Sequence, residues 1–261
     1  MSTIIVLIKK ELKQFFISPI AYVVMMIYLT LSGFFFYTNM ERFSFYYKRL
    51  KTMAQYSQGQ GDLAMINLNE MVIAPALFNM VFVFLFIIPL IMMKSLAEEQ
   101  RQKTDELLRT SPLTVNQMIA GKYLGSLLFI MGIILPTVIY QGLLFYFSSP
   151  ELGPVITGYL GIILFIAAGV SVGLFASSLT ENQIIAAVIA FVVLLFLFII
   201  NLLQVTEGNI FISVLTYLSV TEHLTNMLRG SLDTRDLVYF FSFILFFLFL
   251  TKQSMTAKGW R

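Results

Sequence analysis

Polar and apolar residues in this chain are grouped in long blocks rather than in short alternating runs. Six blocks are almost wholly apolar: 20–37, 71–93, 123–147, 155–179, 184–203 and 237–251. A helix rises about 1.5 Å per residue, so about 20 residues cross the roughly 30 Å hydrocarbon core of a bilayer. Transmembrane strands would alternate apolar and polar side chains, which these blocks do not. The pattern predicts an all-α polytopic membrane protein with six transmembrane helices and a single domain over residues 1–261.

The composition supports a membrane environment for these blocks. Of the 261 residues, 58% are hydrophobic and 12% are charged, whereas a soluble domain has roughly 25% charged residues. The formal net charge of +3 is spread between the blocks, and a nucleic-acid-binding protein would concentrate its basic residues on one face. We therefore expect the lipid bilayer to be a partner of this chain and nucleic acid not to be one.

Residues 1–18 contain an amphipathic segment ahead of the first block. Lys9, Lys10 and Lys13 lie largely opposite an apolar helical face, and Ser18–Pro19 ends the segment. The apolar face consists of Ile4, Ile5, Ile8, Leu12, Phe15 and Phe16. We predict an elbow helix that lies in the cytoplasmic interface of the membrane. The alternative is that this segment simply continues the first span.

The distribution of basic residues predicts the orientation of the spans. With the N-terminus in the cytoplasm, eleven of the 17 Lys and Arg residues fall in cytoplasmic segments and six in outer segments. This favours the inner membrane with both termini in the cytoplasm. The outer segments would be 38–70, a polar loop with a flexible tip at 58–62, and 205–236. Within the second, Asn209–Leu218 is too short to span and predicts a re-entrant or interfacial helix on the outer side.

The sequence contains none of the usual chemistry for binding nucleotides or metals. No G-x-x-x-x-G-K-[ST] phosphate loop is present, because Gly121–Lys122 lacks the upstream glycine. There is no cysteine and only one histidine, His223, which we interpret as an ordinary residue of an outer loop. We therefore predict that this chain is not an enzyme and holds no cofactor or metal of its own.

The predicted spans contain almost no acidic or basic side chains. Secondary carriers need such groups for ion coupling, so their scarcity argues against a carrier. Glu181 is the only candidate, and its place in a tight turn indicates a solvated residue or a helix cap. Gly169 and Gly173 are four residues apart, a spacing that lets membrane helices approach closely. This pair predicts helix packing, either within the chain or between two copies.

The segment 94–122 is the longest predicted cytoplasmic loop and the most charged stretch of the chain. Charges of both signs between Glu98 and Arg109 accompany an apolar side made by Leu96, Leu107 and Leu108. Ser111–Pro112 stops this predicted helix, and Thr114 is placed to cap the next one. The simpler interpretation of this segment is a solvated linker without a binding role. A docking element better explains the combination, because apolar side chains supply affinity and the surrounding charges set the register.

This loop resembles the signature loop of ABC-2-type transporter permeases. The family pattern reads roughly E-E-x-[RK]-x-x-T-x-E-x-L-L-x-[ST]-P and is followed by G-K. The run from Glu98 to Pro112 is similar to it, with Arg109 where the pattern has its second leucine and with Gly121–Lys122 in the place of the G-K pair. The family often has a glycine before the threonine, where this chain has Lys103.

The C-terminal part resembles a particular branch of that family. Tyr217-Leu218-Ser219, Glu222-His223, Leu228-Arg229-Gly230 and the run Asp233 to Phe240 are similar to gliding-motility-associated permeases. Permeases that serve nitrous-oxide-reductase maturation are close relatives of these.

The resemblance implies a dimer of six-span permeases, identical or homologous, each docked to an ABC ATPase subunit that binds ATP and Mg²⁺. The complex would export a substrate or transmit a conformational signal, and an outer-side accessory protein is a further expected partner. The alternatives are a secondary transporter and a membrane anchor that moves no solute. The residues that we expect to couple to the ATPase are Glu98, Glu99, Arg101, Lys103, Thr104, Glu106, Leu107 and Leu108.

Overall fold

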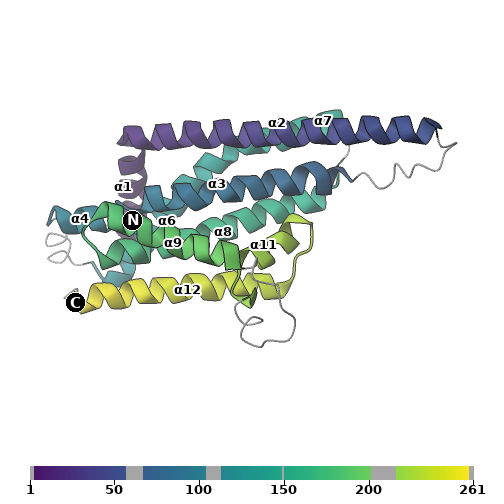
Figure 1. Ribbon diagram of the computed structural model, residues 1–261. Coiled ribbons are helices and arrows are strands. Elements are labelled where there is room, and N and C mark those ends of the chain that lie inside the picture. The colour runs from purple at the N-terminus through teal and green to yellow at the C-terminus, as the bar shows by residue number, and fades with distance from the viewer. Residues whose placement is uncertain (1–2, 57–66, 104–112, 149, 201–215, 259–261) are drawn as a thin grey trace.

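The apolar blocks form long helices that run side by side in the computed structural model of the protein (Figure 1). The structure describes residues 3–56, 67–103, 113–148, 150–200 and 216–258, and all regular elements in them are helical. The elements are α1 (Thr3–Ile17), α2 (Pro19–Tyr56), the π-helical turn η2 (Asn69–Ile73), α3 (Ala74–Met92), α4 (Ala97–Arg101), α6 (Val115–Ile134), the 3₁₀ turn η3 (Leu135–Thr137), α7 (Val138–Phe147), α8 (Leu152–Leu179), α9 (Gln183–Ile199), α11 (Val220–Leu228) and α12 (Thr234–Ala257).

The chain is a multi-pass membrane protein. In the described ranges, five helical stretches are long and apolar enough to cross a bilayer: Pro19–Met53, Asn69–Arg101, Val115–Phe147, Leu152–Leu179 and Thr234–Ala257. The sixth predicted span, 184–203, is represented by α9, which has 17 residues and is therefore about 26 Å long. Residues 201–203 of that span lie outside the described residues. Five of the six predicted spans thus correspond to helices of full length.

Helix α8 lies at the centre of the bundle. In its most apolar window 83% of residues are buried, against 22% in α2 and in α12. It contacts α3, α6, α9, α11 and α12. Its glycines allow this, because a Cβ on Gly169 would lie 2.7 Å from Ile88 of α3, and one on Gly173 would lie 2.5 Å from Met92. The predicted glycine pair therefore faces another helix of the same chain.

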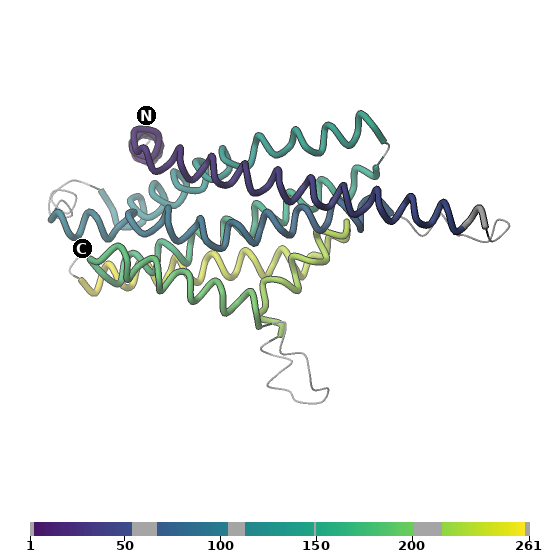
Figure 2. Tube along the Cα trace, turned by 45° about the horizontal axis from the view of Figure 1, so that its top comes forward, coloured from purple at the N-terminus to yellow at the C-terminus, as the bar shows by residue number. Residues whose placement is uncertain are grey.

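Helix α2 is much longer than predicted. The segment 38–56 was expected to be part of a polar outer loop, and the structure shows that α2 continues to Tyr56. The reason is local, since residues 38–56 contain neither glycine nor proline and include several good helix formers. The end of α2 projects beyond the neighbouring helices (Figure 2). The predicted flexible tip at 58–62 lies outside the described residues.

The third pass is a kinked helix. It begins at Val115, eight residues before the predicted start, and Thr114 caps it as predicted by accepting a hydrogen bond from the Gln117 amide (3.3 Å). Pro136 interrupts it within η3, because proline lacks the amide hydrogen that an α-helix needs. Helix α7 then completes the pass.

Helix α1 is a separate helix that lies across the end of α2, at the same end of the bundle as α4 (Figures 1 and 2). Its predicted end at Ser18–Pro19 is confirmed. The predicted apolar face is only partly right, because Ile5 and Phe16 are exposed whereas Glu11 is buried. The face that is covered packs on α6, where Phe15 stacks on Phe129 with 4.7 Å between ring centroids.

The close packing of α8 on α3 predicts a strong dependence on glycine at position 173. Gly173→Ala should lower the free energy of unfolding by about 1–3 kcal/mol, because the added methyl overlaps Met92. Gly132→Ala is the matched control, since no atom lies within 4 Å of a Cβ there. Thermal unfolding in detergent measures both variants, and equal melting temperatures would contradict the packing role.

Candidate functional site

The helix at the start of the predicted docking loop is α4, which covers Ala97–Arg101. We expected one helix over residues 98–109, and this was wrong at 102–103, where the helix has ended; residues 104–109 lie outside the described residues. The helix ends because Lys103 adopts a φ of +54°, in the left-handed region that cannot continue an α-helix. Lys103 occupies the position at which the resembling family often has glycine, the residue best suited to that conformation.

The first turn of α4 is capped by α8. No side chain of the α4 N-terminus accepts its free amides. Instead, Ser177 Oγ accepts hydrogen bonds from the amides of Leu96 and Ala97, both at 2.9 Å. Ser177, Leu96 and Ala97 are all buried, so these two amides have no access to water. The serine therefore satisfies amides that would otherwise be buried without a partner and ties α4 to the central helix.

The last turn of α12 also holds α4. Lys258 Nζ donates to Gln100 Oε1 at 3.0 Å and to the carbonyl oxygen of Ser178 at 2.8 Å. Nearby, Ser254 Oγ donates to the same carbonyl oxygen at 3.2 Å. One cation thus bridges α4 and the end of α8.

A buried ion cluster joins α1, α4 and α6. The Lys122 ammonium donates to Glu11 Oε1 at 3.0 Å and to the Ser95 carbonyl at 2.7 Å, and lies 2.9 Å from Glu99 Oε1. An ammonium has three donors, so these acceptors satisfy it fully. Lys122 and Glu11 side chains are both 5% exposed, and Lys10 lies 3.6 Å from Glu99 at the rim. The cluster contains two cations and two carboxylates.

Two glycines allow α1 to approach this cluster. A Cβ on Gly121 would lie 2.6 Å from Leu7, and one on Gly125 would lie 2.7 Å from the Glu11 Cβ. Gly121 and Gly125 are four residues apart, so they bring the helix backbones together and let Glu11 reach Lys122. Sequence reasoning missed this pair and the buried Lys122, although the spacing of the glycines and a lone lysine at an apolar block were both readable signals.

The predicted coupling residues are only partly described. Glu98 is half-buried and accepts from Gln102 Nε2 at 3.2 Å, and Arg101 and Lys103 are exposed. Glu99 instead turns toward Lys122 within the protein. Thr104, Glu106, Leu107 and Leu108 lie outside the described residues. On α1, Lys9, Lys10 and Lys13 are exposed.

The opposite end of the bundle contains a second buried polar cluster. His223 of α11 is 4% exposed, and its Nε2 donates to the Tyr217 carbonyl at 3.0 Å. Its Nδ1 lies 2.6 Å from Asp236 Oδ1 of α12, and its ring stacks on Tyr239 with centroids 4.1 Å apart. The interpretation of His223 as an ordinary loop residue was wrong, because it joins two helices. The predicted re-entrant helix at Asn209–Leu218 lies mostly outside the described residues, and α11 follows it.

Two further polar residues lie in the turn between α8 and α9. Asn182 caps α9 by accepting from the Ile184 amide at 2.9 Å, and Glu181 is exposed in the turn beside it. Among the described residues, no three His, Asp or Glu side chains gather as a metal site.

The ion cluster predicts a large effect of Lys122→Met. Removing the ammonium leaves Glu11 buried without a cation and Glu99 with Lys10 alone at 3.6 Å, so the free energy of unfolding should fall by about 3–5 kcal/mol. Lys9→Met is the control, because Lys9 is exposed. Unfolding in detergent compares them, and a Lys122→Met variant as stable as Lys9→Met would show that the cluster contributes nothing.

The second cluster predicts that His223→Ala destabilises the protein by about 3 kcal/mol, because Asp236 stays buried without its partner. Asn226→Ala, on the exposed face of the same helix, should leave stability nearly unchanged. Limited proteolysis of the α11–α12 region measures local opening. Equal cleavage rates in the two variants would rule out this role of His223.

Comparison with known proteins identifies the family. The sequence profile of the ABC-2 family transporter proteins matches residues 47–252, which covers most of the chain and all elements from the end of α2 to α12. A search among curated protein sequences finds no significant match. The matched region includes the loop that carries α4, with Lys122 and Ser177, whereas Glu11 and Lys258 lie outside it. The chain is therefore a member of the ABC-2 transporter family, the membrane-embedded subunits of ABC transporters.

Proposed function

We propose that this chain is the permease subunit of an ABC transporter and that a separate ATPase subunit docks at the α4 end. The observation that carries this proposal is the attachment of α4. Ser177 ties it to α8, Lys258 to α12, and Lys122 to α6 and α1. Because each of these contacts joins the short helix to a longer one, a displacement of α4 moves several membrane helices together.

The residues that contact the ATPase are those of the loop between 98 and 108. Arg101 and Lys103 are exposed and Glu98 is half-buried. Thr104, Glu106, Leu107 and Leu108, which lie outside the described residues, complete the proposed set. Glu99 has a different role, because its carboxylate pairs with Lys122. Through this ion pair a displacement of α4 also displaces α6. Lys9, Lys10 and Lys13 flank the docking surface on α1.

The hydrolysis of ATP belongs to the partner. ATP and Mg²⁺ bind to the ATPase subunit, and this chain contributes no cofactor. By the family resemblance, ATP brings two ATPase subunits together, and the docked α4 helices of two permease copies follow them. This is a two-state coupling, in which nucleotide shifts the balance between two arrangements of the spans.

The sidedness follows from this docking. In this proposal the α4 end faces the cytoplasm, and α1 and the end of α12 lie at the same end. Both termini are then on the cytoplasmic side of the inner membrane. The basic residues of α1 support this, because Lys9, Lys10 and Lys13 lie together at that end.

The opposite end supports an outer-side partner. Helix α2 has 38 residues and is about 57 Å long, whereas the hydrocarbon core is about 30 Å thick. Its outer part exposes Phe45 (63%) and Tyr46 (47%) to solvent. Such a surface suits an accessory protein, as in the gliding-motility-like branch, where the complex would transmit a conformational signal or export a substrate.

The docking proposal predicts the effect of reversing charges on α4. Glu98→Lys with Arg101→Glu should reduce the ATPase that co-purifies from native membranes about tenfold, because like charges then face each other across the contact. Glu99 is left unchanged, since its loss would disturb the buried cluster. Glu151→Lys, exposed at the other end of the bundle, is the control.

The co-purified chains are identified by their sequences. An ATPase with a phosphate loop should accompany the unaltered protein and the Glu151→Lys variant. Equal recovery with the α4 variant would show that these residues do not dock the ATPase, and the absence of any ATPase would favour a carrier or an anchor.

A further inference from the structure

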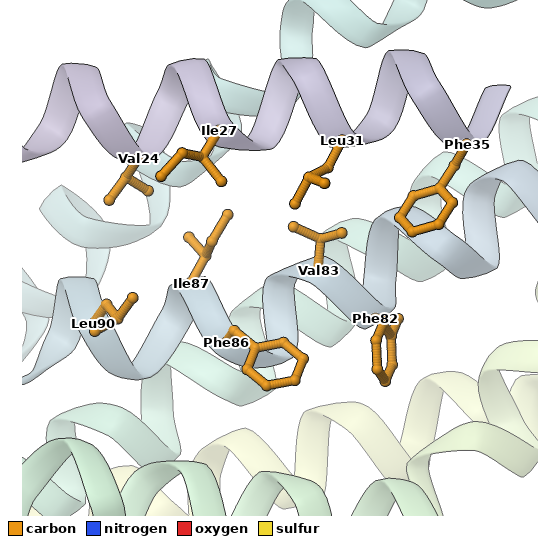
Figure 3. A pocket seen from close by; sticks show the side chains of 9 residues that line it. All are labelled: Val24, Ile27, Leu31, Phe35, Phe82, Val83, Phe86, Ile87 and Leu90. Atoms are coloured by element: carbon orange, nitrogen blue, oxygen red, sulfur yellow. The ribbon is translucent and has the colours of Figure 1, made fainter. Parts of the chain in front are cut away.

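An apolar groove of about 220 Å³ runs between α2 and α3 (Figure 3). Ile27, Leu31 and Phe35 point from α2 toward α3, and Val83 and Ile87 point back from α3. The two helices contact each other at Tyr28 and Phe84, with 4.4 Å between ring centroids, so the groove is an opening along this contact. Within a bilayer such a groove fills with hydrocarbon, since water has no polar partner in it.

A second, polar pocket of about 330 Å³ lies at the α4 end, where α1, α2 and the start of α4 meet. Its lining includes Gln14, Ser18, Lys94, Ser95 and Glu98. A small hollow of about 30 Å³ lies between the two.

The three hollows lie in succession along α2, and we refer to them together as the track. The small hollow shares Val24 and Leu90 with the groove, and Ser18 and Lys94 with the polar pocket. From Ser18 to Phe35 the track follows about 26 Å of helix α2, nearly the thickness of the roughly 30 Å hydrocarbon core. A track that is charged at one end and apolar along its length matches the shape of an amphiphile.

The polar pocket contains groups without partners in the described part of the chain. Ser95 is 6% exposed, and its Oγ makes no hydrogen bond. Lys94 is half-buried and forms no ion pair with a described residue. Glu98, with the opposite charge, lines the same pocket. A buried hydroxyl and a partly buried ammonium both favour a ligand that accepts hydrogen bonds.

We propose that this track binds one phospholipid with a primary-amine headgroup, of the phosphatidylethanolamine type. The phosphate lies at Lys94 and Ser95, the ammonium at Glu98, and one acyl chain follows the small hollow into the groove. In this pocket the Glu98 carboxylate balances the Lys94 ammonium, so a headgroup without net charge fits better than one with net negative charge. A choline headgroup carries no N–H and cannot donate to Glu98.

This assignment defines a role for the α1–α2 corner. The lipid fills the space between α2 and α3 and contacts Ser18, where α1 joins α2. The proposal does not depend on the ATPase, so its test uses the full chain alone.

Native mass spectrometry of the purified chain, mixed with phosphatidylethanolamine, phosphatidylcholine or phosphatidylglycerol, measures the binding. One phosphatidylethanolamine should bind per chain in preference to the other two. Lys94→Glu and Ser95→Ala alter the polar pocket, and Ile27→Trp fills the groove. Lys94→Glu and Ile27→Trp should each reduce bound phosphatidylethanolamine about tenfold. Ser95→Ala should reduce it several-fold.

The controls lie on α1 and α2 but outside the lining of the track. Lys13→Glu changes an exposed lysine of α1, and Val23→Trp changes an exposed residue of α2, so neither should alter binding. Equal binding by variants and controls, or a preference for phosphatidylglycerol, would overturn the proposal. The chain has no native cysteine, so disulfide cross-linking of Ile27→Cys between copies gives a further test. Efficient cross-linking would mean that a second copy, and no lipid, occupies the groove.

Discussion

The α4 end of the bundle depends on the burial of the Lys122 ammonium. Moving such an ion out of water costs several kcal/mol, and partners must offset this cost. The partners come from α1 (Glu11), from α4 (Glu99) and from the Ser95 carbonyl just before α4. None of these three segments can leave without exposing a buried charge to an apolar surrounding. The positions of α1, α4 and α6 are therefore set together.

Much of the fold was predictable from the sequence, because the length and continuity of apolar blocks report directly on membrane helices. The helix ends at Ser18 and Thr114 were predictable too, since proline and a capping threonine act locally. The polar clusters were not. Lys122 and Glu11 are 111 residues apart in the chain, and His223 and Asp236 meet only when α11 folds against α12. Such pairs leave no local pattern that a single sequence displays.

The docking loop illustrates the same limit. Mixed charges and a leucine stripe predicted a helix over 98–109, and they cannot show where the backbone turns. Lys103 with its φ of +54° ends the helix after Arg101. Likewise, Glu99 looked equivalent to Glu98 in the motif, yet one carboxylate faces the buried ammonium and the other stays at the surface pocket. The direction of a side chain on so short a helix depends on the helices packed around it. The sequence alone does not show which helices these are.

The contacts around α4 are unequal in kind, and this difference indicates which part of the molecule can move. Toward α8 and α12, α4 is held by direct hydrogen bonds, and α8 itself is closely packed through its glycines. Helix α2 is attached differently: it packs on α3 through Tyr28 and Phe84, with 4.4 Å between ring centroids, and joins α1 at Ser18. Lipid-exposed helices gain little from hydrophobic association within a bilayer, so close packing and hydrogen bonds decide which helices stay together. A displacement of α4 would therefore carry α8 and α12 with it and would reach α2 through the α1–α2 corner, which makes that corner the point where the position of α2 relative to α8 would change.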